Sequence, residues 1–314
     1  MRIAIFGAGA VGSYFGGRLA QAGEDVVFIA RGEHLQAMRD SGLRVDSIKG
    51  DFVLESVEAT DNPAQVGVVD AIFVCVKGWQ MAEAMQAIRP MIGPQTLVIS
   101  LQNGVEAPSQ LAAGLGKELV LGGLCVIIAY IVEPGHISHA GADPFIRFGE
   151  LDNRPSERVE KLRQAFDRAS GLTVEIPPDI NAAMWQKFIF ITAISGVGAV
   201  TRAPVGAVRS QPGTRQMLEK AIREIYDVAR ARSIDLPENV PDKTMEFIDR
   251  MPQEATVSMQ RDIMNGRPSE LEVQNGAVVR LGQEAGVETP VNSFIYHSLL
   301  PMELRARGEL KFDE

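Results

Sequence analysis

The sequence predicts an α/β protein in which a doubly wound parallel sheet is followed by an all-helical domain. Short apolar runs alternate with segments of helical spacing through the first half of the 314 residues. These runs are continuously apolar, which is typical of strands that helices cover on both faces of a sheet. After about residue 180, long helical patterns replace the alternation. We therefore expect two domains, residues 1–179 and residues 180–314.

Five apolar runs are expected to supply the strands of the sheet. They cover residues 2–7, 25–30, 71–77, 96–102 and 119–130. Helical spacing marks residues 11–23 and 80–92, and a further helical segment, 156–170, lies between strand-like pieces at 134–150 and 172–178. The domain boundary is expected near Pro177 to Asn181, where the alternation of strands and helices gives way to long helical patterns.

The overall charge limits the partners of the protein. A net charge of −9 and a pI near 5.1 argue against nucleic acid or an anionic membrane, which basic surfaces bind. Cys75 and Cys125 both lie in apolar runs and are too few for a zinc or disulfide framework, so we expect no metal site and a reducing compartment. The first residues lack the basic start and cleavage site of a signal peptide. We expect a cytoplasmic protein.

The stretch "GAGAVG" places Gly7, Gly9 and Gly12 between the first expected strand and the first expected helix. In a Rossmann domain, three glycines at this spacing permit the tight turn, the close approach of a pyrophosphate, and the packing of the helix on the strand. Ala10 and Val11 belong to the same turn and are expected beside the cofactor. The alternative is a glycine-rich turn without a ligand.

The second expected strand ends at Arg31, where an NAD enzyme usually offers an acid to the ribose hydroxyls. A guanidinium at this place can bind a 2′-phosphate through paired charge-assisted hydrogen bonds, whereas a carboxylate would repel it. Arg31 therefore favours NADPH/NADP+ as the cofactor. A solvated surface arginine is the alternative.

Two further strand ends lie at the edge where ligands of open α/β sheets bind. Lys77 follows the third expected strand and could add a cation for a phosphate or carboxylate, or could simply be solvated. Asn103 precedes a glycine, and this dipeptide suits a ligand-binding amide and a structural turn equally well.

A single lysine, Lys187, stands at the start of an apolar stretch that reaches to Arg202 without another charge. On a helix that begins near Ala182, Lys187, Ile191 and Ser195 fall four residues apart and share one face. A lysine that is partly desolvated there has a lowered pKa and can donate a proton to a developing alkoxide. The alternative is a lysine that extends to water and ends the apolar stripe.

Residues 256–276 are expected to form a helix with Ser258 and Asp262 on one face, then a turn and a second helix. Ser269 and Glu272 have the spacing of a capping box, so Glu272 is expected to cap the second helix. Glu270 is less explained, although the helix dipole favours a carboxylate in a first helical turn.

Together these motifs resemble the ketopantoate reductases (2-dehydropantoate 2-reductases). The resemblance runs almost end to end, through "GAGAVGSYFG", "VKGWQ", "LQNGV", "MWQKF", "SMQRDIMNGRPSELEVQNG" and "GVETPVN". It implies an NADPH-binding Rossmann domain, an all-helical C-terminal domain and an active site in the cleft between them. Arg31 and Lys77 match the pair at the adenosine phosphate.

The resemblance also implies roles for residues of the second half and for one strand end. Lys187 corresponds to the catalytic lysine, and Glu270 to the acid that contacts the cofactor. Asn103 corresponds to the asparagine that touches cofactor and substrate, and Ser258 to the serine that binds the substrate carboxylate.

Three positions depart from the family pattern. Well-studied members carry asparagines where this chain has Ile191, Ser195 and Val205. A substrate hydroxyl that loses its amide partner forfeits on the order of 1–3 kcal/mol. We still expect Ile191 and Ser195 to line the substrate pocket beside Lys187, but with fewer polar contacts.

The implied function is NADPH-dependent reduction of a 2-keto acid to a 2-hydroxy acid, by resemblance 2-dehydropantoate to pantoate in pantothenate biosynthesis. The expected partners are the cofactor and a small 2-keto acid, without nucleic acid or membrane, and a homodimer is left open. Two alternatives remain: a reductase of a less polar 2-keto acid, and a non-catalytic protein that binds or senses NADPH.

Overall fold

The computed structural model describes residues 1–311. The chain forms two compact units. The first, called the sheet unit below, contains Met1–Gln102 and Ala107–Ile180. The second, the helical unit, contains Asn103–Glu106 and the chain from Asn181 onward. The short segment Asn103–Glu106 therefore belongs with the C-terminal helices, although the sequence pattern places it at a strand end of the first half.

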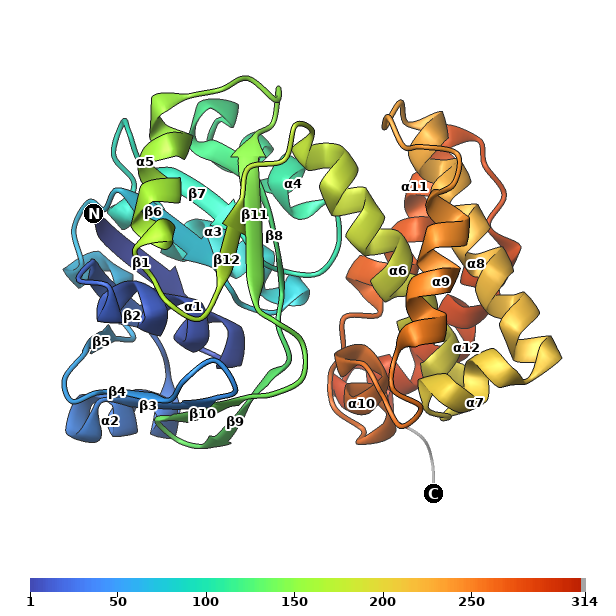
Figure 1. The fold of residues 1–314 in the computed structure, drawn as a ribbon, viewed down its shortest axis with the longest axis horizontal. Coiled ribbons are helices and arrows are strands. Elements are labelled where there is room, and N and C mark those ends of the chain that lie inside the picture. The colour runs from blue at the N-terminus through green and yellow to red at the C-terminus, as the bar shows by residue number, and fades with distance from the viewer. Residues whose placement is uncertain (312–314) are drawn as a thin grey trace. The chain divides into compact units, whose positions relative to one another are not determined.

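An eight-stranded sheet forms the centre of the sheet unit, in the order β12-β11-β8-β7-β6-β1-β2-β5 (Figure 1). Its strands are β1 (Arg2–Phe6), β2 (Asp25–Ile29), β5 (Glu58–Thr60), β6 (Ala71–Val74), β7 (Leu97–Ser100), β8 (Val120–Val126), β11 (Phe145–Glu150) and β12 (Thr173–Glu175). The six strands from β5 to β8 are parallel, and their order reverses between β1 and β6. This is the doubly wound Rossmann arrangement that the sequence predicts.

Beyond the parallel strands the large sheet is mixed, because β11 pairs antiparallel with β8. A parallel pair needs a crossover, usually a helix, between its strands. The chain between β8 and β11 instead forms a hairpin of β9 (Ala129–Glu133) and β10 (His136–His139). The hairpin joins β3 (Leu43–Ser47) and β4 (Phe52–Leu54) in a second, four-stranded sheet that the sequence pattern does not reveal.

Successive residues of β1 pack into two different cores, which confirms that helices cover both faces of the large sheet. Ile3 and Ile5 belong to one cluster of buried side chains, and Ala4 and Phe6 belong to the other. The covering helices are α1 (Ala10–Gln21), α2 (Gly32–Ser41), α3 (Met81–Ala87), α4 (Ala107–Leu115) and α5 (Glu157–Asp167). The helix expected over 80–92 ends early, since Pro90 cannot continue it and the chain passes into a 3₁₀ turn.

The helical unit is built from seven α-helices of the described chain. They are α6 (Ile180–Thr201), α7 (Val205–Ser210), α8 (Pro212–Ala231), α9 (Val240–Arg250), α10 (Ser258–Met264), α11 (Ala277–Ala285) and α12 (Pro290–Ala306). Among residues 1–311, α6 is the one helix long and apolar enough to cross a membrane, but 72% of its most apolar window is buried in the protein. Its side chains supply a large part of the helical core. We interpret α6 as the central helix of that core.

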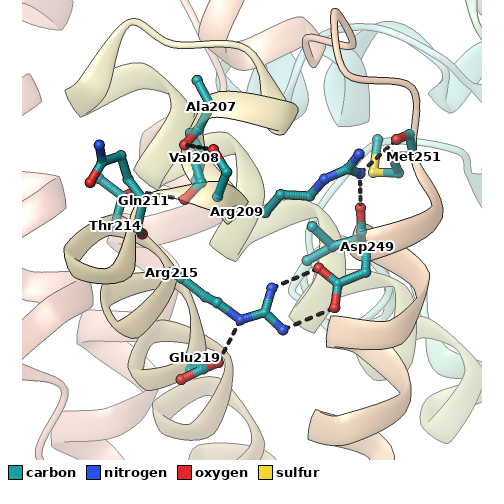
Figure 2. Close-up of polar contacts among 11 residues, drawn as sticks. Ala207, Val208, Arg209, Gln211, Thr214, Arg215, Glu219, Asp249 and Met251 are labelled. Atoms are coloured by element: carbon teal, nitrogen blue, oxygen red, sulfur yellow. Dashed lines mark hydrogen bonds and ion pairs between the residues drawn. The ribbon is translucent and has the colours of Figure 1, made fainter.

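Two arginines connect the helices α7, α8 and α9 (Figure 2). Arg209 on α7 donates to the carbonyl oxygens of Ile248 and Met251, at 2.8 and 2.6 Å. Arg215 on α8 holds both carboxylate oxygens of Asp249 on α9, at 2.7 and 2.9 Å. Such bidentate pairs fix geometry as well as charge, so these contacts set how the outer helices pack.

Candidate functional site

The glycine turn after β1 has the geometry that a dinucleotide requires. Gly7 adopts a positive φ of 100°, and a Cβ on it would lie 2.7 Å from the Cγ1 atom of Val76. A Cβ on Gly12 would lie 2.4 Å from the carbonyl oxygen of Gly7. Only glycine fits either position without moving backbone, because real Cβ atoms do not approach so closely.

Gly9 is different, since a Cβ there would meet no protein atom within 4 Å. Gly9 is also the N-cap residue of α1 and no side chain caps this helix. Ala10 and Val11, the first helical residues, are half-buried. The open space at Gly9 lies at a helix N-terminus, whose amide groups and dipole attract anions such as a pyrophosphate. The residues of this turn therefore fit the cofactor.

The two cations predicted for the phosphate site follow the strands on either side of β1. Arg31 comes after β2 and forms an ion pair with Glu83, at 2.6 Å, with both side chains more than half exposed. Lys77 comes after β6, and its Nζ atom lies 5.9 Å from the ring centre of Trp79. Because β2, β1 and β6 are adjacent and parallel, the glycine turn and both cations lie beyond the carboxyl ends of these strands, on the same side of the sheet unit.

Lys187 lies in the second turn of α6, half-buried, between core residues of the helical unit. Within residues 1–311 its side chain has no hydrogen bond or ion pair. On the same helix Ile191 is half-buried and Ser195 is fully buried, and the Ser195 hydroxyl has no hydrogen-bond partner in the described chain. Val205, the third departure from the family pattern, is 1% exposed in the helical core.

Asn103 and Glu270 are brought together within the helical unit. The Nδ2 atom of Asn103 donates to Oε2 of Glu270 at 2.8 Å, and Glu270 is only 5% exposed. Ser258 is the first residue of α10 and is half-buried. The sequence singles out Asn103 and Glu270 separately, but 167 residues separate them in the chain, so no spacing pattern predicts their contact.

The expected capping box of Ser269 and Glu272 is wrong. The Ser269 hydroxyl accepts from the amide of Leu271 at 3.2 Å, as a helix cap does, but the Ser269 amide donates to Glu303 instead of Glu272. The segment Glu272–Gly276 forms a π-helix rather than the first turn of an α-helix. The Glu272 carboxylate accepts from Tyr296 and pairs with Arg280. Glu303, and not Glu272, therefore accepts the hydrogen bond from the Ser269 amide.

Sequence reasoning missed three side chains of this region: Glu106, Arg280 and Tyr296. Arg280 donates to the carboxylate of Glu106 at 2.8 Å, across 174 residues of chain. Tyr296 donates to Glu272 at 2.7 Å, and burial together with this hydrogen bond raises the pKa of Tyr296 to about 12. The sequence contains no local signal for these contacts, because each joins elements that are distant in the chain.

Comparison with known proteins extends over nearly the whole chain. The model of the family "Ketopantoate reductase PanE/ApbA" matches residues 3–153, and the model of its C-terminal part matches residues 179–303. The chain is 31% identical to the 2-dehydropantoate 2-reductase of Archaeoglobus fulgidus, over 93% of this chain and 94% of the relative.

Solved structures agree with this assignment. The PanE/ApbA family ketopantoate reductase of Ralstonia eutropha JMP134 is 31% identical, with a TM-score of 0.88 over 98% of this chain and 100% of that one. A D-mandelate dehydrogenase in complex with NADH is 25% identical, with a TM-score of 0.86 over 98% and 100% of the two chains. The protein is thus an NADP-dependent oxidoreductase of the 2-keto acid reductase type, and the chain belongs to the ketopantoate reductase PanE/ApbA family.

Proposed function

We propose that the protein reduces 2-dehydropantoate to pantoate with NADPH, as a step of pantothenate biosynthesis. The observation that carries the proposal is Lys187: a half-buried amine on an apolar helix, without a hydrogen bond or ion pair in residues 1–311. Fully buried lysines are almost always paired, so the unpaired ammonium of the half-buried Lys187 is available to a substrate oxygen. The named reductases that this chain resembles over almost its full length support the substrate.

Each residue has a separate role in the proposed reaction. When bound, NADPH supplies a hydride to C2 of the keto acid. Lys187 polarises the carbonyl oxygen and gives it a proton as the alkoxide forms. Ser258 binds the substrate carboxylate. Asn103 orients the substrate and the cofactor, and Glu270 fixes the asparagine by accepting one N–H of its amide.

A second candidate substrate is a less polar 2-keto acid. Ile191 and Val205 are apolar where family members carry amides, and half-buried Ile191 leaves apolar surface on the face of Lys187. An apolar group gains about 0.8 kcal/mol per buried methylene. The similarity to a D-mandelate dehydrogenase supports this candidate, because mandelate is an aromatic 2-hydroxy acid. A non-catalytic NADPH-binding protein is the third candidate, and it would have no use for Lys187.

An assay of NADPH oxidation separates the three candidates. We expect the highest kcat/KM for 2-dehydropantoate among a panel with 2-ketoisovalerate, 2-ketoisocaproate, phenylpyruvate and benzoylformate. Preference for an apolar acid would establish the second candidate, and no turnover of any acid would establish the third. Lys187→Met should lower kcat by roughly 10²–10⁴-fold and leave the Kd of NADPH nearly unchanged. A large loss of stability with intact kcat would contradict the catalytic role of Lys187.

A further inference from the structure

The segment Asn103–Glu106 is attached to the helical unit at each of its four residues. Asn103 bonds to Glu270 at 2.8 Å. Gly104 has a φ of 108°, and its backbone lies so close to the π-helix that a Cβ would be 2.9 Å from the carbonyl oxygen of Val273. Val105 packs against the helical core. Glu106 accepts from Arg280 at 2.8 Å.

Arg280 is the centre of the charged part of this attachment. Its guanidinium donates to the carboxylates of Glu106 and Glu272 and to the carbonyl oxygen of Glu272. Tyr296 binds the other oxygen of the Glu272 carboxylate at 2.7 Å. Burial opposes the charge of Arg280, but Glu106 and Glu272 outweigh it and raise the pKa of the guanidinium. One cation therefore holds two carboxylates, of which one stands on the segment and one on the π-helix.

The geometry points to Arg280 as a positioning residue for Asn103. We propose that Arg280 acts through Glu106 to hold the side-chain amide of Asn103 within hydrogen-bond distance of Glu270. Arg280 does not touch Asn103, but in this way it affects how Asn103 binds substrate and cofactor. The inference rests on the proposed function of Asn103. Without the guanidinium, Glu106 and Glu272 would repel each other and Glu106 would lose its ion pair with α11.

Among the nearby contacts, Arg280 is the side chain that joins the Glu106 end of the segment to the π-helix. The Glu270 carboxylate bonds to Asn103 alone among the residues that the structure describes, so it fixes the amide but not the rest of the segment. Tyr296 reaches Glu272 and no part of the segment. Val105 contributes apolar packing, which has no preferred direction. The hydrogen bond from Arg280 to Glu106 is directional, and it holds Asn103, three residues away, in position.

The test is a double-mutant cycle on the full-length protein. Arg280→Met should lower kcat/KM for the best keto acid by roughly 10-fold to 100-fold, because misplacing a contact by about 1 Å has effects of that size. The double variant Asn103→Ala/Arg280→Met should be no worse than Asn103→Ala within about twofold, since a residue that acts through Asn103 has nothing left to act on. Additive losses would overturn the proposal.

Three further variants separate positioning from general stability. Arg280→Lys should recover part of the activity, because an ammonium can hold one carboxylate but not both in a fork. If Arg280→Met folds poorly, Glu106→Gln takes its place in the test. Glu106→Gln keeps the shape of the side chain and should give a smaller loss of kcat/KM than Arg280→Met. Arg232→Met removes a comparable ion pair with Glu284, at 2.8 Å on the same unit, and should leave kcat/KM unchanged. A loss in Arg232→Met equal to that in Arg280→Met would overturn the proposal.

A readout without turnover keeps this inference distinct from the proposed function. Hydrogen–deuterium exchange of the amides at 103–106 should be faster in Arg280→Met than in the unmodified protein, and unchanged in Arg232→Met. The same cycle can be measured as the Kd of NADPH by its fluorescence. If the unmodified protein reduces none of the acids, the proposed function fails, whereas the exchange and the Kd cycle still decide the role of Arg280. Unchanged exchange in Arg280→Met would refute it.

Discussion

At the scale of single residues, the ion pair of Arg31 with Glu83 bears on cofactor choice. Both side chains are exposed, and a surface pair of this kind contributes about 0–1 kcal/mol. A 2′-phosphate must compete with Glu83 for the guanidinium. Glu83→Gln should therefore lower the Kd of NADPH by up to about fivefold and leave the Kd of NADH unchanged, because NADH has no 2′-phosphate.

The matched variant Arg31→Asp should act in the opposite direction. It replaces the cation with a carboxylate that repels the 2′-phosphate, so the Kd of NADPH should rise toward or above that of NADH. Fluorescence titration of both cofactors checks both variants. Equal shifts for NADPH and NADH in either variant would show that Arg31 does not contact the 2′-phosphate.

At the scale of elements, two glycines in the turn between β1 and α1 are expected to have different roles, Gly12 mainly in folding and Gly9 mainly in cofactor binding. Gly12→Ala puts a Cβ 2.4 Å from the Gly7 carbonyl oxygen, so it should destabilise the protein by about 1–3 kcal/mol and weaken NADPH binding. Gly9→Ala puts a Cβ into open space at an ordinary φ of −74°. It should leave the melting temperature unchanged but raise the Kd of NADPH about tenfold or more, or about 1.4 kcal/mol. Calorimetry and titration on both variants test this contrast, and an unchanged Kd in Gly9→Ala would place the pyrophosphate elsewhere.

Local patterns predict the strands that are buried on both faces more completely than the exposed ones. β1, β2, β6 and β7 are continuously apolar runs, and the structure confirms all four. β4, with three residues, has no pattern long enough to recognise, and β9 carries exposed side chains along most of its length. Periodicity reports burial, so a very short strand such as β4 or an exposed one such as β9 escapes it.

The residues of the candidate site also fall into two groups, those that local sequence predicts and those that it does not. The glycine turn and Arg31 are predicted because their roles depend on neighbours in sequence. Lys187 stands out as a lone charge in an apolar helix. The contacts of Asn103 with Glu270 and of Glu106 with Arg280 depend on chain separations of 167 and 174 residues. Only the tertiary fold brings such residues together, and the assignment of Asn103–Glu106 to the helical unit follows from it.

At the scale of the whole molecule, the two units differ in the carboxylates whose pKa values the fold shifts. In the sheet unit, burial alone would raise the pKa of Glu24 and of Glu150, but hydrogen bonds from cationic groups outweigh it and lower both. Among the described residues of the helical unit, Asp249 is the carboxylate whose pKa is lowered, by its hydrogen bonds from Arg215. The helical unit also has Asp227, whose pKa is raised by burial.

These directions predict that acid weakens the sheet unit more than the helical unit. A carboxyl whose folded pKa lies below its unfolded value stabilises the fold above the unfolded value, near 4.5 for Glu24 and Glu150, and this contribution disappears as the pH falls through the folded pKa. The sheet unit should lose this stability below about pH 4.5. In the helical unit, Asp227 is stabilised by protonation and offsets part of the loss at Asp249.

The two tryptophans allow each unit to be followed alone. Trp79 lies in the sheet unit and Trp185 in α6 of the helical unit, so Trp185→Phe and Trp79→Phe each leave one reporter. Urea unfolding at pH 7 and pH 4 should show a larger fall of the midpoint for Trp79 fluorescence than for Trp185 fluorescence. Glu24→Gln should reduce the difference, because it removes a carboxylate that is bound by the N-terminal ammonium and Arg168. Equal falls at both reporters would mean that the units unfold as one cooperative body, and that acid sensitivity does not belong to the sheet unit.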